Sequence, residues 1–591
     1  MASTLSPMDA KEIDDKRQST LSAISDDQTT AAPTPNRRSI DVEKEMTSKE
    51  IGDAEKHSNS DVEAEDVEKQ GEALERVESS PYPGPVKLLM IVISVCLAVF
   101  LCALDMTIVA TAIPEITDEF HSLTQVGWYG SAFFLTLASF QSTWGKGYKY
   151  WPLKTVFLIS IFIFEVGSLI CAVAQNSTTL IVGRAIAGVG GAGIASGAYT
   201  IIALSVPPSR QPAFTGILGA TFSIASVVGP LLGGVFTTNV TWRWCFYINL
   251  PVGGLSAALI VFFFTTPKQA KPVAAELKEK ILQLDAPGTF TFMACVICFL
   301  LAMQWGGATK SWGSSDVIGV LVGAGVIFAV FIAIEIYQNE RALLVGRLLR
   351  FKTIAFACAF QFFNSGAFMV NLYFLPIYFQ TVSDVSAAQS GVRNLPYILG
   401  ISLLTIVSGG AITATGHYIP ALVIGSVIST VGSGMIYTLD IGTSSSKWIG
   451  YQALGGIGIG IAIQVPIIIG QAVVDPIDLS SVTAMLLFFQ TLAGAIFISV
   501  AQSIFSNRLL HVAAARIPSV NPGMIVATGA TDIRKVFPPE IVPEIIVSYM
   551  QALKSTYILA IAMAGMSAVV AFAVCFFDWR TIKGAKVGGA A

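Results

Sequence analysis

The sequence predicts an all-α polytopic membrane protein, and three observations support this prediction. Apolar residues make up 53% of the 591 residues and charged residues only 13%, about half of the usual charged share of roughly 25%. Fourteen segments are apolar over a length near the roughly 20 helical residues that a bilayer core requires. Their order of six, two and six predicts two six-helix bundles around an inserted pair, as in transporters built from repeats.

The first 86 residues have a different composition from the rest of the chain. They contain 10 Lys and Arg against 20 Asp and Glu, and no aromatic residue occurs before Tyr82. Such a segment buries too little apolar surface to offset its ordering entropy. We therefore expect a disordered acidic cytoplasmic tail over 1–86.

The predicted spans define the domains that we expect. They lie near 88–113, 125–144, 155–174, 181–204, 214–237, 246–264, 287–305, 316–336, 354–379, 390–413, 418–439, 448–471, 480–506 and 556–577. The domains are an N-terminal six-helix bundle over 87–264, a central linker with two extra transmembrane helices over 265–353, a C-terminal six-helix bundle over 354–577 that includes an external loop over 507–555, and a cytoplasmic tail over 578–591.

Charge in the short connections predicts the orientation of the chain. One set of alternate loops carries twelve Lys and Arg residues and the opposite set carries four, and the richer set belongs on the cytoplasmic side. Both termini are then cytoplasmic, and the sequons at Asn176 and Asn239 are external candidates for glycosylation. We expect the plasma membrane, with the vacuolar membrane as the alternative.

Asp105 and Arg184 are charged residues inside predicted spans. A charged side chain at the centre of a membrane helix costs roughly 2.5–3.5 kcal/mol on insertion scales, so Asp105 should face the bundle interior and pair or be protonated. Arg184 lies in a stretch otherwise free of charge and stays ionised, so it needs an acidic partner, aligned carbonyls or water. Both are candidates for proton coupling, with a structural role as the alternative for each.

Glycine-rich stretches follow Arg184 and mark the fifth span. Gly188 and Gly190 belong to a G-x-G-x-x-G pattern, which inside an apolar helix predicts close helix packing and not a dinucleotide site. In the fifth span, Pro230 lacks a backbone N–H and kinks a helix, while the glycines around it allow close approach and bending. We interpret this cluster as a hinge, and its glycines are Gly216, Gly229, Gly233 and Gly234.

No sequence pattern indicates an enzyme. A G-x-x-x-x-G-K-[ST] phosphate loop is absent, and no nucleophile–base, metal or cofactor arrangement emerges. The four histidines lie far apart in sequence and form no local metal motif. We therefore expect no enzymatic activity, no cofactor, no metal site and no nucleic acid partner.

These residues together resemble the major facilitator superfamily, specifically its fungal branch of fourteen-span drug:proton antiporters. The segment Leu104–Thr107 is similar to the first-helix signature of that branch. Arg184 with its following glycines resembles the helix-four arginine motif, which the family associates with proton coupling. Gly229-Pro230 with its neighbours resembles the helix-five antiporter motif, which is typical of exporters. The resemblance covers residues 87–580 and implies the major facilitator fold.

The basic turn over 145–154 is similar to the family's loop between helices two and three. The resemblance implies a gating role for its residues Gly145, Lys146, Lys149 and Lys154. Lys149 stands where the wider superfamily places an aspartate, so the chain departs here from the usual carboxylate-based gate.

The resemblance implies a proton-coupled efflux transporter that exports hydrophobic small molecules (drugs, antifungals, mycotoxins or other secondary metabolites) by alternating access. Protonation of Asp105, or of another buried carboxyl, would bias which side is open, and Arg184 would modulate that step through its charge. The expected partners are a small hydrophobic substrate, protons and the lipid bilayer, and we expect a monomer. The candidate cavity residues on the ninth span are Gln361, Asn364, Asn371 and Tyr373.

Two alternatives stay open at this point. One is proton-coupled uptake, or vacuolar transport, of a siderophore or a basic amino acid. The other is a membrane sensor that binds a solute and signals through the acidic tail. The glycine and proline cluster of the fifth span favours export over uptake.

Overall fold

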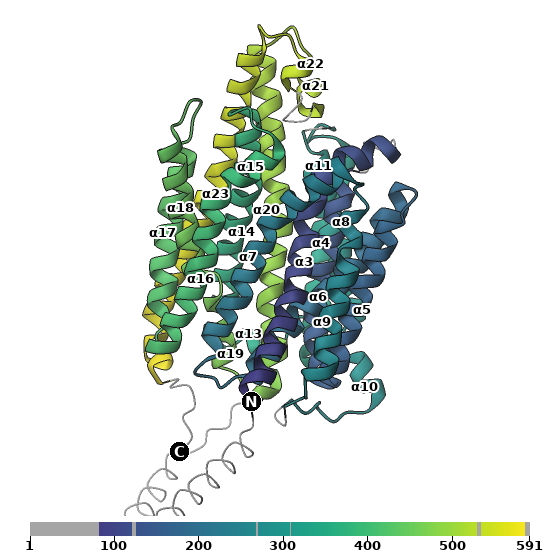
Figure 1. The fold of residues 1–591 in the computed structure, drawn as a ribbon, viewed down its shortest axis with the longest axis vertical. Helices are drawn as coiled ribbons and strands as arrows, with labels where there is room; N and C mark the ends of the chain where they lie inside the picture. The colour runs from purple at the N-terminus through teal and green to yellow at the C-terminus, as the bar shows by residue number, and fades with distance from the viewer. Residues whose placement is uncertain (1–81, 121–125, 268–269, 308, 529–532, 585–591) are drawn as a thin grey trace, which may run out of the picture. The chain divides into compact units, whose positions relative to one another are not determined.

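The described part of the chain is built of α-helices. The computed structural model describes residues 82–120, 126–267, 270–307, 309–528 and 533–584, and Ser79–Ala591 form one compact unit (Figure 1). Almost all of the predicted acidic tail over 1–86 lies outside the described residues. Within the described residues no strand is formed, apart from one isolated bridge between Gly306 and Lys310.

The N-terminal half and the inserted pair precede residue 350. The helices of the N-terminal half are α3 (Pro85–Phe120), α4 (Val126–Tyr150), α5 (Leu153–Ala172), α6 (Ser177–Ser205), α7 (Gln211–Asn239), α8 (Trp244–Tyr247) and α9 (Asn249–Phe263). The central segment consists of α10 (Leu277–Leu282), α11 (Ala286–Trp305), α12 (Ser315–Gln338), the 3₁₀ turn η2 (Asn339–Arg341) and α13 (Gly346–Leu349).

The C-terminal half follows the central segment. Its helices are α14 (Lys352–Thr381), α15 (Ala387–Arg393), α16 (Leu395–Thr415), α17 (Ile419–Tyr437), α18 (Ser445–Ala462), α19 (Val465–Ala472), η3 (Pro476–Asp478), α20 (Leu479–Arg516), α21 (Pro522–Ala527), α22 (Ile533–Val536) and α23 (Val542–Gly584). Each predicted span coincides with one helix or with two consecutive helices of the structure.

Thirteen helical stretches in the described residues are long and apolar enough to cross a membrane. The predicted span over 125–144 is the exception, because α4 is long enough but is not among the thirteen. Polar residues of α4 such as Gln141 and Ser139 are buried inside the bundle, where they do not face lipid. The chain is therefore a multi-pass membrane protein in which α4 is sheltered by other helices.

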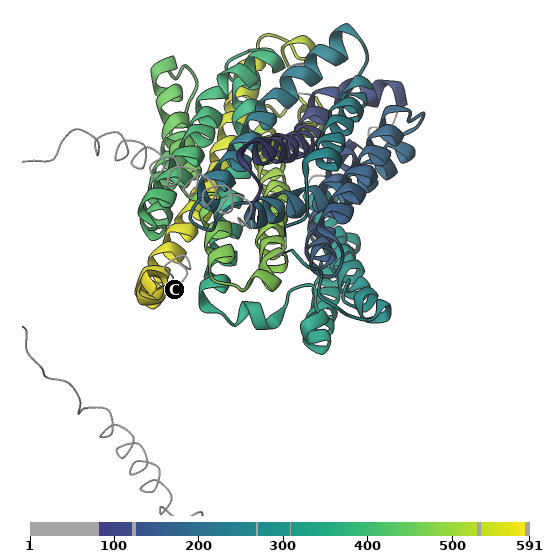
Figure 2. The same cartoon turned by 60° about the horizontal axis from the view of Figure 1, so that its bottom comes forward.

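The two halves pack against each other mainly along two pairs of helices, and α6 also contacts α20. Within the N-terminal half, α3 packs on α7 and α9, and α6 packs on α4 and α5. Within the C-terminal half, α14 packs on α20 and α23, and α18 packs on α16 and α17. Between the halves, α4 packs on α20 and α7 packs on α16. Figure 2 shows the purple-to-blue helices of the first half beside the green-to-yellow helices of the second.

One end of the bundle carries the turn between α4 and α5, and we call it the basic end because Lys146, Lys149 and Lys154 lie there. Chain direction places the starts of α3, α5 and α7 at this end. The ends of α3, α5 and α7 lie at the other end, which we call the opposite end. The predicted orientation makes the basic end cytoplasmic, and this assignment stays a prediction.

The predicted external loop over 507–555 is helical at both of its ends. α20 continues to Arg516 and α23 begins at Val542, so the connection between the two helices is shorter than predicted. Apolar side chains such as Leu509 and Ile545 recur at helical spacing and are buried in one core cluster. An ion pair of 2.8 Å between Arg516 and Glu544 also joins the two helices. Figure 1 shows this pair rising beyond the ends of the other helices.

Candidate functional site

Asp105 and Arg184 form a buried ion pair inside the N-terminal half. Arg184 Nη1 on α6 donates to Asp105 Oδ2 on α3, and both side chains are 0% exposed. Arg184 Nε also donates to the backbone oxygen of Tyr129 on α4 at 2.8 Å. The sequence predicted that Asp105 would pair or be protonated and that Arg184 would need an acidic partner, carbonyls or water. In the structure the two residues pair with each other. Pairing makes two charges tolerable in an interior that would penalise either alone.

Asn249, the first residue of α9, links this ion pair to α5. Its Nδ2 lies 3.3 Å from Asp105 Oδ1 and 3.0 Å from Ser168 Oγ on α5. The Arg184 guanidinium carbon also lies 4.5 Å from the centre of the Phe133 ring, in cation–π geometry. The ion pair and its neighbours therefore connect helices α3, α4, α5, α6 and α9.

The glycines after Arg184 allow α6 to approach its neighbours closely. A Cβ at Gly190 would lie 2.7 Å from Phe164 Cα on α5, and a Cβ at Gly188 would lie 3.1 Å from the Phe133 carbonyl carbon on α4. Real Cβ atoms do not come as close as the first distance. The pattern thus packs helices together, as predicted, and fixes α6 where Arg184 reaches Asp105.

The glycines of α7 hold that helix against the turns of α3 that follow Asp105. A Cβ at Gly229 would lie 3.1 Å from Thr107 Cβ, and a Cβ at Gly233 would lie 2.6 Å from the Ile108 oxygen. Pro230 lies inside α7, which remains helical on both sides of it. At Gly234 an added Cβ would meet nothing within 4 Å. The hinge role of this cluster stays a prediction.

At the basic end, an ion pair joins the two halves. Lys149 Nζ on α4 lies 2.8 Å from Asp478 Oδ1, and Arg347 Nη2 lies 2.8 Å from Asp478 Oδ2. Gly145 permits this approach, because a Cβ there would lie 3.0 Å from the Ser480 oxygen on α20. In this contact the N-terminal half supplies the cation, Lys149, and the C-terminal half supplies the carboxylate, Asp478.

Lys146 attaches the same end of α4 to the central segment. Its side chain is buried, and Nζ donates to the backbone oxygen of Arg341. Asp285 lies close by and accepts from the backbone N–H of Leu343 at 2.7 Å. Lys154, by contrast, is partly exposed and donates to the Val261 oxygen at 2.8 Å within its own half.

Gly216 lies at a second contact between the halves. A Cβ at Gly216 on α7 would lie 2.7 Å from the Thr405 oxygen on α16. Gly409 on α16 approaches α7 in the same way, because a Cβ there would lie 3.1 Å from the Pro212 carbonyl carbon. Both contacts lie in the part of α7 near the basic end.

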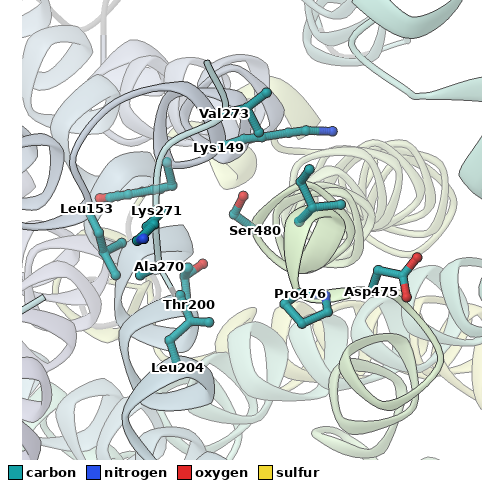
Figure 3. Close-up of a pocket in the computed structure, with 12 residues that line it drawn as sticks. Lys149, Leu153, Thr200, Leu204, Ala270, Lys271, Val273, Asp475, Pro476 and Ser480 are labelled. Carbon is teal, nitrogen blue, oxygen red and sulfur yellow. The ribbon is translucent and has the colours of Figure 1, made fainter. Parts of the chain in front are cut away.

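A cavity of about 430 Å³ lies at the basic end beside the Lys149–Asp478 pair (Figure 3). It lies between the N-terminal half, the segment that precedes α10, and the start of α20. The residues that line it are Tyr148, Lys149, Leu153, Thr200, Leu204, Ala270, Lys271, Val273, Asp475, Pro476, Ile477 and Ser480. None of the predicted cavity residues on α14 belongs to this set.

The predicted cavity residues on α14 divide into two groups. Gln361 and Asn364 are fully buried, and the nitrogen and oxygen atoms of both amides have no hydrogen-bond partner among the described residues. Asn371 instead donates to Ser433 Oγ on α17 at 3.0 Å, inside the C-terminal half. Tyr373 is partly buried in a core cluster and interacts electrostatically with Arg184 of the other half.

Both predicted sequons lie at the opposite end. Asn176 precedes α6 and is exposed, and its side chain accepts from the Thr179 N–H at 2.8 Å. Asn239 is the last residue of α7 and is also exposed. Their glycosylation stays a prediction.

Sequence reasoning missed three polar residues of these sites. Glu165 on α5 has both carboxyl oxygens buried and without a hydrogen-bond partner, and its signal was a single acid in the predicted span over 155–174. Asn249 and Asp478 lie at helix starts, where a polar residue is common. No group of three or more metal-ligating side chains occurs in the described residues.

Comparisons with known proteins agree with this architecture. The family model described as Major Facilitator Superfamily matches residues 95–498, which is more than half of the chain. The MFS-type transporter grgE of Penicillium sp is 48% identical over 525 residues, which cover 89% of this chain and 92% of that protein. The probable efflux pump gsfJ of Penicillium aethiopicum is 47% identical over 503 residues, which cover 85% of this chain and 89% of that protein.

The proton:xylose symporter XylE shares the fold. Its structure matches with a TM-score of 0.56 at 11% identity and covers 85% of this chain and 97% of that protein. At that identity the likeness establishes the architecture and nothing about the solute. The chain is a membrane transporter and not an enzyme, and it belongs to the Major Facilitator Superfamily, in the branch that contains the fungal MFS-type transporters and efflux pumps.

Proposed function

We propose that the protein exports small hydrophobic molecules from the cell in exchange for protons, by alternating access of the two halves. Several relatives carry the name efflux pump, including gsfJ and MFS1. The observation that carries the proton-coupled part is the buried Asp105–Arg184 pair. It places a titratable group at a junction of helices, so a change in its charge alters how those helices pack.

The coupling step is protonation of Asp105. A neutral carboxyl attracts the Arg184 guanidinium less strongly, so Arg184 must find other acceptors. The structure provides candidates, because Arg184 Nη2 and Asn249 Oδ1 are both buried without a hydrogen-bond partner among the described residues. A shift of Arg184 toward Asn249 would move α6 relative to α3 and change which end of the bundle is open.

The basic end forms the cytoplasmic gate in this proposal. The Lys149–Asp478 pair and the Gly216–Thr405 contact close this end between the two halves. Opening it requires both to separate, and the cavity of about 430 Å³ beside the ion pair gives the moving groups space. The protein resides in the plasma membrane as a monomer, with both termini in the cytoplasm.

The substrate contacts lie between the halves, near α14. Gln361 and Asn364 are fully buried, and their amide groups have no hydrogen-bond partner among the described residues. Buried polar groups without partners are costly unless a ligand or water satisfies them. A hydrophobic molecule with a few hydrogen-bonding groups would satisfy these amides and leave its apolar surface against the surrounding side chains.

The test uses the full-length chain in proteoliposomes with an imposed pH gradient. The transported compound is one to which overexpressing cells become resistant and deletion cells sensitive. Asp105→Asn should reduce gradient-driven transport by at least about tenfold, as expected on removal of a proton-transfer group. The matched control is Asp316→Asn, which removes an exposed carboxylate paired with Lys310 and should leave transport unchanged.

Each outcome has a defined meaning. Wild-type transport that is indifferent to the pH gradient would disprove proton coupling. Accumulation in deletion cells lower than in overexpressing cells would indicate uptake. Terminal tags that antibodies reach only from outside intact cells would reverse the proposed orientation.

A further inference from the structure

Glu165 is an acidic residue within the bundle that the coupling step above does not use. It lies on α5, one helical turn before Ser168, within a stretch of mean hydropathy high enough to span a membrane. Both of its carboxyl oxygens are buried and have no hydrogen-bond partner among the described residues. An ionised carboxylate in such surroundings is strongly disfavoured, whereas a neutral carboxyl is tolerated.

Helix α9 is shaped to receive the Glu165 side chain. A Cβ at Gly253 would overlap this carboxyl group and would lie 2.7 Å from its Cδ, so a side chain there would displace the carboxyl from its present position. The adjacent Gly254 has open space, since an added Cβ meets nothing within 4 Å. The absence of a side chain at Gly253 therefore leaves the space that the carboxyl occupies.

The Glu165–Gly253 contact belongs to a row of polar contacts along α9. One turn toward the opposite end, Asn249 joins Ser168 and Asp105. On the same face of α9, one turn toward the basic end, Ser256 donates to the Ser94 oxygen of α3 at 2.8 Å. Four residues of helix separate Asn249 from Gly253, so Glu165 lies about 6 Å closer to the basic end than the Asp105 site.

The groups around Glu165 define its electrostatic environment. The Asp105 charge on α3 acts on it directly. Three of the helices packed against α5 carry other titratable or charged groups. Arg184 on α6 is paired with Asp105, the Cys245 thiol on α8 also interacts with Asp105, and the Tyr129 hydroxyl on α4 donates to Ser177. Helix α9 has no titratable side chain.

We propose that Glu165 is a second proton-binding site, which holds a proton while Asp105 is ionised and releases it when Asp105 becomes protonated. The site contains one guanidinium and two carboxyls, and a buried site of low dielectric favours zero net charge. One of the two carboxyls is then ionised at a time. This inference rests on the proton-coupled function proposed above.

The two sites together move one proton across the membrane in each cycle. A proton enters from the opposite end and binds an Asp105 oxygen, which neutralises that carboxylate. The Glu165 carboxyl then loses its proton toward the basic end, past the Ser94–Ser256 contact, and its carboxylate balances Arg184. When the transporter resets, the proton on Asp105 passes to the Glu165 carboxylate, so Asp105 is ionised and Glu165 protonated again. One proton has then crossed from the opposite end to the basic end, and the net charge of the site is unchanged.

The direct test is infrared spectroscopy of the full-length protein in lipid, where a protonated carboxyl gives its own C=O absorption. At neutral pH the wild type should show such a band, and Glu165→Gln should remove it. The control Glu544→Gln changes a half-exposed carboxylate paired with Arg516 and should keep the band. A spectrum of Glu165→Gln that equals the wild type in this region would overturn the proposal.

A second measurement uses the glycine pair on α9. Gly253→Ala should shift the carboxyl band, because the added methyl displaces the carboxyl, while Gly254→Ala should leave the band in place. In proteoliposomes, Glu165→Gln should lower gradient-driven export by at least about tenfold, and substrate exchange without a gradient should persist and show that the variant is folded. Equal band positions in both alanine variants would also overturn the proposal.

These results separate the two proposals. If wild-type transport ignores the pH gradient, the proposed function fails, whatever the infrared spectrum shows. If the wild type responds to the gradient and Asp105→Asn abolishes the response, but Glu165→Gln transports and absorbs like the wild type, only the second proton-binding site is refuted.

Discussion

Lys149 on α4 and Asp478 at the start of α20 form an ion pair of 2.8 Å that links the two halves at the basic end. The side chains are 15% and 6% exposed, so salt screens this pair less than an exposed one. Arg347 shares the same carboxylate. One acidic side chain thus pairs with cations of both the first half and the central segment.

Removal of Lys149 should loosen this end of the bundle. Lys149→Ala leaves Asp478 with Arg347 alone. It should lower the free energy of local opening by about 1 kcal/mol, which raises the population of the open form roughly fivefold. Hydrogen exchange over residues 476–484 measures this effect. Lys154→Ala is the control, because Lys154 bonds only a carbonyl of its own half. Equal exchange in the two variants would show that the ion pair does not hold the halves together.

Breaking the Asp105–Arg184 pair should destabilise the fold. Asp105→Asn leaves a buried guanidinium without its counter-ion, at a cost of about 3 kcal/mol. The double variant Asp105→Asn with Arg184→Gln removes the unpaired charge and should recover part of that loss. Unfolding of the purified variants in detergent measures both values. If the double variant is as unstable as the sum of the two single variants, the residues are not energetically coupled.

The amides of α14 should respond to substitution in opposite ways. Gln361→Leu removes buried polar atoms that lack partners, so the free energy of unfolding should stay the same or rise by about 1 kcal/mol. Asn371→Leu breaks the bond to Ser433 and should lower it by a similar amount. The Gln361→Leu variant should also export a different range of compounds from the wild type. Identical effects of both variants on stability and on the range of compounds would contradict the assignment of Gln361 to the substrate site.

The connection between α17 and α18 should respond to acid. A hydrogen bond of 2.7 Å from Lys554 on α23 holds the pKa of Asp440 below its usual value. A group whose pKa is lowered by folding contributes stability above its unfolded pKa and loses it as pH falls through the folded value. At neutral pH, Lys554→Ala should therefore raise the rate of hydrogen exchange over 438–444. The free energy of local opening should fall by about 0.5 kcal/mol, a value that allows for solvent screening.

The control for this comparison is Lys447→Ala on the first turn of α18. The difference between Lys554→Ala and the wild type should vanish once the pH is below the folded pKa of Asp440. A difference that stays constant down to that pH would mean that the ion pair is not its source.

The helices were predictable because the signal for a membrane span is local. A run of about 20 apolar residues determines a helix wherever it occurs in the fold, and each predicted span corresponds to helix. The loop predicted over 507–555 begins later than predicted, because α20 continues to Arg516 and its Leu509 packs in one core cluster with Ile545 of α23. The connection between α20 and α23 contains polar residues, and a local sequence pattern does not indicate that the two helices pack together.

The site was predictable only in part, because partnership is a property of the folded chain. Asp105 and Arg184 were identified as candidates that should pair, but they lie 79 positions apart in the sequence. The sequence around either residue does not indicate which residue is its partner. Glu165 was missed because one acid barely changes the hydropathy of its span. Its significance depends on the space left by Gly253 on another helix.

The long α20–α23 hairpin, with α21 and α22 beside it, provides a binding site for an antibody fragment that would help to image different conformations of the transporter. Arg534 of α22 pairs with Asp384 near the end of α14 at 3.0 Å, so the projection is fastened to the second half. An antibody fragment raised against it would add mass outside the micelle and orient single particles by that half. Displacements of the first half could then be sorted into classes from one frozen sample.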